Sequence, residues 1–242
     1  MTSDRFHWGA GAQIADRQGR WAEIRRQVQS AARRGAEQPV LQPYVAISRE
    51  AGAGGNEVAA RVGELLSWRV LAKEILDEVA DELQLDPKFL SLLDETRLSW
   101  FGESVLSLVN ARLVSQDVYV ERLIKMLLVA LSHEPAVIVG RGATAFLPPS
   151  RGLAVRLVAD EADRIERIAA LEKLDEAAAR HRVHEADRAR LSFVRHHFHL
   201  DADEPLGYDL VVNTGRTGVE GAARIVVAAL AARGFASTRG GG

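Results

Sequence analysis

The sequence predicts an α/β fold in which helices cover both faces of a parallel sheet. Five short apolar runs are distributed along the chain, and longer segments with apolar residues at helical spacing separate them. The runs are apolar throughout rather than alternating, which is typical of strands that are buried on both faces. The first run also leads directly through a glycine-rich turn into a helical segment.

Length and composition suit one such domain with a short appendage. The chain has 242 residues, of which 47% are hydrophobic and 26% charged, as in a globular protein with a sizeable core. A net charge of −2 gives no basic field for nucleic acid, and the lack of cysteine excludes disulfides, thiolate chemistry and cysteine-based zinc sites. No membrane span or secretory signal is evident, so we expect a cytoplasmic protein that binds neither nucleic acid nor membrane.

Both ends of the chain differ from the central part. In residues 1–38, Trp21, Ile24 and Val28 recur at helical spacing with arginines between them. We expect an N-terminal extension with an amphipathic helix, which docks on the domain or forms a homodimer; binding to a membrane surface is the alternative. Residues 236–242 are expected to be a flexible tail.

The stretch that begins at Tyr44 carries the clearest local signal. Residues 45–47 indicate a buried strand, the glycines of residues 52–55 allow a tight turn with exposed N–H groups, and the pattern is helical from Asn56. Unpaired N–H groups and the helix dipole favour a phosphate at such a point. We therefore expect a phosphate-binding loop made of Ser48, Arg49, Gly52, Ala53, Gly54, Gly55, Asn56 and Glu57. A purely structural turn is the alternative.

This loop meets the pattern G-x-x-x-x-G-K-[ST] only in part. Gly55 stands where that pattern has the lysine that reaches the outer phosphates of a nucleotide, and no serine or threonine follows to bind magnesium. Glu57 is able to ligate magnesium through its carboxylate, but it would repel a phosphate beside it. The loop therefore offers the geometry for a phosphate without the usual catalytic groups.

Four segments in order resemble the cytidylate kinase-like family, a divergent branch of the nucleoside monophosphate kinases whose loop also lacks the lysine. They are Ile-Ser-Arg-Glu-Ala-Gly-Ala-Gly-Gly-Asn-Glu-Val (47–58), Val-Ile-Val-Gly-Arg-Gly-Ala (137–143), Asp-Arg-Ala-Arg (187–190) and Tyr-Asp-Leu-Val-Val-Asn-Thr (208–214). The resemblance implies a P-loop kinase-like three-layer sandwich over residues 39–235, with a five-stranded parallel sheet in the order 2-3-1-4-5. It also implies nucleotides as partners and ATP with Mg²⁺ as cofactors, although no metal ligand is evident.

The resemblance further implies an acceptor site built from several segments. A helical cap over the acceptor nucleotide is expected at about residues 84–133. Arg141 follows the strand at 137–139, at the end of the sheet where ligands gather, and its guanidinium is suited to bidentate phosphate binding. Lys73 and Arg97 are further candidates for the acceptor phosphate, with a solvated charged surface as the alternative reading.

A lid is expected at about residues 172–204, after the strand at 152–159. In the family, arginines of this region approach the transferring phosphate, and here they would replace the charge of the missing lysine. The residues expected to take part are Arg164, Arg167, Asp187 and Arg188. The histidines of residues 196–199 suggest a metal site, but too few ligands converge, and a flexible lid loop is the preferred interpretation.

Taken together, these patterns predict an ATP-dependent nucleoside monophosphate kinase-like protein with cytidylate-type transfer. The chain departs from the family at Ala72 and Val139, where relatives have aspartates near the acceptor, so the acceptor stays open. A nucleotide-binding or sensing module without turnover is the alternative, because the loop lysine is missing. A pure interaction protein that uses its N-terminal helix is a third possibility.

Overall fold

A computed structural model describes residues 41–72 and 118–235 of the chain. Within these ranges five strands form one parallel sheet in the order β2-β3-β1-β4-β5, as the sequence predicted. The strands are β1 (Tyr44–Arg49), β2 (Arg69–Leu71), β3 (Ala136–Val139), β4 (Gly152–Val158) and β5 (Leu210–Asn213). The predicted N-terminal extension, the flexible tail, Lys73 and Arg97 lie outside the described residues.

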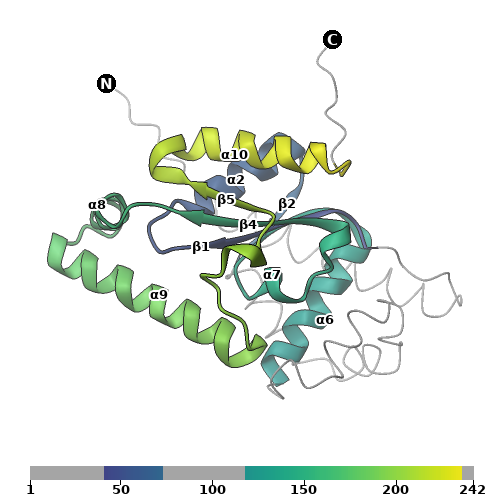
Figure 1. Cartoon of the computed structure of the whole chain (residues 1–242), viewed down its shortest axis with the longest axis horizontal. Coiled ribbons are helices and arrows are strands. Elements are labelled where there is room, and N and C mark those ends of the chain that lie inside the picture. The colour runs from purple at the N-terminus through teal and green to yellow at the C-terminus, as the bar shows by residue number, and fades with distance from the viewer. Residues whose placement is uncertain (1–40, 73–117, 236–242) are drawn as a thin grey trace, which may run out of the picture. The chain divides into compact units, whose positions relative to one another are not determined.

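Helices cover both faces of the sheet, which confirms the three-layer architecture. In Figure 1, α2 (Gly55–Leu66) and α10 (Thr214–Ala232) lie over one face, and α6 (Val118–His133) and α7 (Ala143–Phe146) lie on the other. The helices α8 (Glu161–Glu172) and α9 (Glu176–Phe198) follow β4, with α9 on the same side as α6. Two short 3₁₀ turns, η2 (Pro149–Arg151) and η3 (Pro205–Gly207), precede β4 and β5.

The strand register aligns the carboxyl ends of the central strands. Ile47 of β1 pairs with Val139 of β3 on one side and with Val155 of β4 on the other, and all three are buried. Their side chains belong to one apolar cluster that also contains residues of α2 and α10. The loops that follow β1, β3 and β4 therefore start from the same edge of the sheet, where ligands of open α/β sheets bind.

Several elements end at other residues than the sequence suggested. The sequence of residues 67–72 predicts a second short strand; the observed strand, β2, is shorter, because Ser67 ends α2 in a left-handed conformation with a φ of 55°. Residues 196–198, which were expected in a flexible lid loop, are instead the last turn of α9, whereas residues 199–204 are not helical. In the described part of the chain, no group of three or more His, Cys, Asp or Glu side chains is placed to hold a metal ion.

The described part of the predicted cap is a core helix. Leu123, Leu127 and Leu131 of α6 are all fully buried, and the Leu131 carbonyl oxygen accepts a hydrogen bond from the Gln42 N–H at 2.7 Å. The remainder of the expected cap lies outside the described residues. None of the described helices is both long and apolar enough to cross a bilayer.

Candidate phosphate-binding site

The loop between β1 and α2 presents free backbone donors at the edge of the sheet. The turn closes with a 3.3 Å hydrogen bond from the Ala53 N–H to the Glu50 carbonyl oxygen. The first hydrogen bond of α2 runs from the Val58 N–H to the Gly54 carbonyl oxygen. The N–H groups of residues 55–57 therefore have no acceptor within the helix. Together with the dipole of this 12-residue helix, these groups form an anion-binding position.

Two glycines let neighbouring groups approach the loop backbone closely. Gly52 and Gly54 have positive φ angles of 79° and 70°, which residues with a side chain rarely adopt. A Cβ atom on Gly52 would overlap the backbone carbonyl of Arg164, and one on Gly54 would overlap Nη1 of Arg167. The structure thus brings Arg167 to the loop, with its guanidinium against Gly54.

The loop is packed against the α8–α9 pair by an apolar cluster and held by a hydroxyl from the other side. The cluster consists of Ala51, Ile165, Ala179 and Val183, all of them buried. On the opposite side, the buried Thr214 Oγ1 donates to the Ala53 carbonyl oxygen at 2.9 Å. These contacts fix the loop backbone.

Asp187 and Arg164 join α9 and α8 to the first half of the loop. Asp187 Oδ1 accepts a 2.7 Å hydrogen bond from the Ala51 N–H, and its Oδ2 accepts one of 2.5 Å from Arg164 Nη1. Arg164 also donates to the carbonyl oxygens of Ala51 and Ala159, at 3.3 and 3.1 Å. The side chain of Asp187 is only 23% exposed and that of Arg164 only 11%. In this arrangement Arg164 holds the loop, and its predicted contact with a phosphate stays a prediction.

Two further residues of the family-like segments, Glu50 and Arg190, strengthen this attachment, although they are not among the predicted site residues. Glu50 Oε2 accepts a 3.1 Å hydrogen bond from the Ala159 N–H and lies 3.5 Å from Arg164 Nε. Arg190 Nη1 donates to the Arg49 carbonyl oxygen at 3.3 Å and lies 3.7 Å from Asp187 Oδ1. Burial lowers the pKa of the Arg190 guanidinium, and the Asp187 charge opposes this shift. The sequence signal for this pair was the family-like segment Asp-Arg-Ala-Arg (187–190), in which both residues stand.

The turn after β3 places Arg141 in an unusual backbone conformation. Gly140, Arg141 and Gly142 have successive positive φ angles of 78°, 56° and 67°. An arginine in the left-handed region is strained, and such strain persists where surrounding contacts impose it. Here the Phe198 ring at the end of α9 fills the space that a Cβ atom on Gly142 would need. The turn that carries Arg141 is therefore held in place by the lid helix.

Arg49 connects the loop to this turn. Its aliphatic stem passes beside Gly55, where a Cβ atom would lie 2.5 Å from Arg49 Cγ. Its Nη1 atom reaches Gly140 and occupies the position that a Cβ atom would take there. The side chain of Arg49 thus lies between the start of α2 and the carboxyl end of β3.

Ser48 belongs to a different polar network. Its Oγ accepts a 2.9 Å hydrogen bond from Arg156 Nη1, while Arg156 Nη2 donates to Asp203 Oδ1 at 2.7 Å. The Tyr208 hydroxyl lies 3.3 Å from Ser48 Oγ and donates to the Ala202 carbonyl oxygen at 2.8 Å. This network ties the segment between α9 and η3 to β1 and β4, so the predicted contact of Ser48 with a cofactor remains a prediction.

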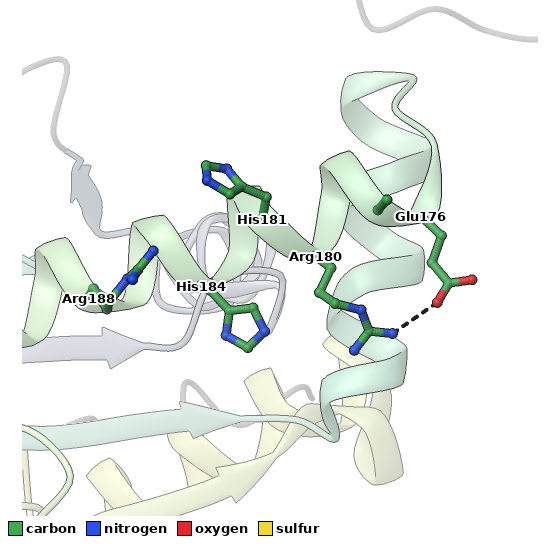
Figure 2. A pocket seen from close by; sticks show the side chains of 6 residues that line it. Glu176, Arg180, His181, His184 and Arg188 are labelled. Atoms are coloured by element: carbon green, nitrogen blue, oxygen red, sulfur yellow. Dashed lines mark hydrogen bonds and ion pairs between the residues drawn. The ribbon is translucent and has the colours of Figure 1, made fainter.

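Arg188 lies on the exposed side of α9, beside an open hollow of about 700 Å³. Figure 2 shows the residues that line the hollow, which are Glu176, Ala177, Arg180, His181, His184 and Arg188. Arg180 pairs with Glu161 and Glu176, each at 2.9 Å. Within the described ranges Arg188 forms no ion pair, so its charge is available to a ligand.

Two arginines contact the loop: Arg49 at the end of β1 lies against Gly55, and Arg167 on α8 lies against Gly54. Two others lie on neighbouring segments, Arg141 in the turn after β3 and Arg188 on the exposed side of α9. Asn56 and Glu57 are exposed in the first turn of α2, whereas Ala53 is buried and contributes backbone only. Backbone N–H groups and guanidinium groups that converge on one point are suited to a polyanion such as a phosphate chain.

Comparisons with known proteins identify a matching family and proteins of similar fold. A sequence model for a family described as "Cytidylate kinase-like family" matches residues 44–216. No curated protein matches the chain. The crystal structure of an uncharacterized protein from Eubacterium ventriosum is similar with a TM-score of 0.56 and 22% identity, and the match covers 78% of this chain and 99% of that one.

Two named kinases are also among the structurally similar proteins. A shikimate kinase from Bacteroides thetaiotaomicron matches with a TM-score of 0.43 and 15% identity, over 79% of this chain and 99% of that one. A gluconokinase from Sinorhizobium meliloti matches with a TM-score of 0.38 and 15% identity, over 82% and 94% of the two chains.

Proposed function

The chain belongs to the cytidylate kinase-like family, and from this premise we propose that it is an ATP-dependent nucleoside monophosphate kinase with cytidylate-type transfer. The observation that carries the proposal is the convergence of loop N–H groups and arginines at one edge of the sheet. In phosphoryl transfer, catalysis consists mainly of positioning and of stabilising charge on the transferred group. Donors and cations fixed by the fold are what such a reaction needs.

In this proposal each part of the site has a separate role. Within residues 52–57, the N–H groups other than that of Ala53, which closes the turn, hold the phosphates of ATP, and Arg141 holds the phosphate of the acceptor. Arg167 and Arg188 act on the transferring group, because one lies against Gly54 and the other follows Asp187 on α9. Asp187 and Arg164 position the loop, since their charges already neutralise each other at 2.5 Å.

The residues present fit ATP better than they fit a metal ion. The glycines of the loop let Arg49 and Arg167 lie against its backbone, and the start of α2 offers donors for phosphate oxygens. Magnesium usually keeps several waters and binds one or two carboxylates plus substrate phosphates. Glu57, exposed in the first turn of α2, is the candidate protein ligand. Bound Mg²⁺ would supply charge neutralisation to the phosphate chain.

The test is a pair of measurements on the full chain. ATP affinity is measured by calorimetry, and phosphate transfer is measured with magnesium and a panel of nucleoside monophosphates. We expect transfer to at least one acceptor, with cytidylate preferred, and a loss of at least about tenfold in Arg141→Ala, the scale of one charged contact. Arg224→Ala is the matched control, because Arg224 is exposed on α10 and pairs with Glu220 there. Absence of nucleotide binding by the wild-type chain would refute the proposal.

A nucleotide-binding or sensing module without turnover is the second candidate, because Gly55 replaces the lysine of the usual loop. Loss of one transition-state contact costs on the order of a hundredfold or more in rate. Arg188→Ala distinguishes the two functions: a kinase loses turnover, whereas a sensing module loses affinity at most. A cytoplasmic location and a homodimer formed through residues 1–38 remain predictions within either function.

A further inference from the structure

The loop has a cationic residue at a different position from the usual phosphate-binding pattern. In the pattern G-x-x-x-x-G-K-[ST] the first position is a small residue and the seventh is the cation. In this chain the first position is Arg49, the sixth is Gly54 and the seventh is Gly55. The same two positions therefore hold one cationic residue and one glycine, in exchanged order.

The geometry explains why an arginine at position 49 requires a glycine at position 55. A Cβ atom on Gly55 would lie 2.5, 3.0 and 3.1 Å from Cγ, Cβ and Cδ of Arg49. Carbon atoms without a bond between them do not approach that closely. A lysine at position 55 is therefore incompatible with the course of the Arg49 side chain, and Gly55 is the residue that leaves room for it.

A second glycine determines where the charge ends. The Nη1 atom of Arg49 occupies the position that a Cβ atom on Gly140 would take. The guanidinium thus lies next to Gly140 in the turn after β3, while the stem of the side chain passes the start of α2. The backbone of Arg49 is fixed as well, because its carbonyl oxygen accepts a hydrogen bond from Arg190 Nη1 at 3.3 Å.

We propose that Arg49 supplies the loop charge that the seventh-position lysine supplies in the usual pattern, and this rests on the proposed kinase function. An oxygen of the acceptor phosphate forms a bond to the γ-phosphorus of ATP, while the bond from that phosphorus to the bridging oxygen breaks. The electron pair stays on that oxygen, which leaves with ADP. Arg49 forms no bond and transfers no proton; its permanent charge neutralises oxygens of the transferring group.

This role differs from compensation by the lid arginines. Arg49 extends from a central strand whose backbone pairs with β3 and β4, whereas Arg167 and Arg188 extend from helices. A guanidinium fixed by the sheet is positioned before the nucleotide binds, and preorganised charge stabilises a transition state most. We therefore expect Arg49 to affect turnover more than either lid arginine.

The first experiment exchanges the two residues. Arg49→Ala is expected to lower turnover by about a hundredfold, the cost of one electrostatic contact, with ATP affinity changed less. Gly55→Lys alone is expected to be equally impaired, because the two side chains collide. The double variant Arg49→Gly/Gly55→Lys rebuilds the usual arrangement, and we expect it to be at least about tenfold more active than either single variant. Full activity in Arg49→Ala, or no recovery in the double variant, overturns the proposal.

The second experiment tests the packing without relying on activity. Gly55→Ala should lower the thermal midpoint in the wild-type chain, because its Cβ atom meets the Arg49 stem. In an Arg49→Gly background, which removes all three carbon atoms of that stem, the same substitution should leave the midpoint unchanged or raise it, since alanine favours a helix. Equal effects in both backgrounds overturn the geometric basis. A wild-type chain that binds no nucleotide refutes the kinase function itself, whereas failure confined to these variants refutes only the role of Arg49.

Discussion

At the scale of single residues, the contact of Asp187 with the loop after β1 was not expected: its carboxylate accepts a hydrogen bond from the backbone of that loop. Asp187 accepts a hydrogen bond from the Ala51 N–H and pairs with Arg164, and neither side chain is more than a quarter exposed. A pair with so little exposure contributes more to stability than a surface ion pair, because loss of one partner leaves an uncompensated charge.

We predict that Asp187→Asn keeps a hydrogen-bond acceptor for Ala51 but removes the charge that faces Arg164. The expected loss is about 1–3 kcal/mol of unfolding free energy, from a partly buried cation without its main partner. Urea unfolding followed by circular dichroism measures it. Glu185→Gln makes the same change of charge at an exposed position two residues earlier, and it should change stability by less than about 0.5 kcal/mol. Equal effects of the two substitutions would contradict this role of Asp187.

Residue patterns predicted local geometry well and long-range polar contacts poorly. The turn at residues 52–55 follows from its glycines, because positive φ angles and close approaches need them. The partners of Arg156 did not emerge from the sequence, since Ser48 and Asp203 lie 108 and 47 residues away along the chain. An arginine inside an apolar strand was the one signal that a buried polar network existed there.

At the scale of elements, the ends of helices were harder to predict than their existence. The lid helix α9 continues to Phe198 because that ring stacks on Phe146 at a centroid distance of 5.9 Å and lies against Gly142. Such a contact joins elements far apart in sequence, so the local pattern predicted the helix only as far as Val194. The strand order, by contrast, followed from the family resemblance and is confirmed.

The helices α2 and α10 are linked by an exposed ion network that gives a testable dependence on pH. Glu220 accepts hydrogen bonds from Arg61 Nε at 2.6 Å and from Arg224 Nε at 2.7 Å. The hydrogen bonds from Arg61 and then Arg224 lower the pKa of this carboxyl from 4.5 to about 2. Since the folded pKa is the lower one, the stabilisation is present above pH 4.5 and is lost as the pH falls towards about 2.

We therefore predict that Glu220→Gln removes a small, pH-dependent part of the stability. The variant should be less stable than wild type at neutral pH, and the difference should shrink as the pH falls below about 4.5. Urea unfolding at several pH values measures this difference. Glu166→Gln, at an exposed carboxylate of α8, serves as the control. A difference that grows on acidification would show that Glu220 acts in another way.

At the scale of the whole molecule, the site exists only when distant segments come together. The loop after β1, the turn after β3 and the pair α8–α9 are joined by contacts of Ala51, Arg49 and Asp187. The unfolded chain has no such arrangement, so a ligand of this site binds the folded state alone and stabilises it by mass action.

We predict that ATP at a hundred times its Kd raises the free energy of unfolding by about 2.7 kcal/mol. Gly52→Ala should reduce this gain at the same ATP concentration, because the Cβ atom overlaps the Arg164 backbone at a positive φ of 79°. Gly207→Ala is the matched control, since a Cβ atom there meets nothing within 4 Å. Thermal unfolding of the three proteins with and without ATP measures the effect. If ATP stabilises Gly52→Ala as much as wild type, the nucleotide binds elsewhere than at this loop. If the stabilisation by ATP is smaller in Gly52→Ala alone, nucleotide binding depends on this loop, which the assembled sheet positions.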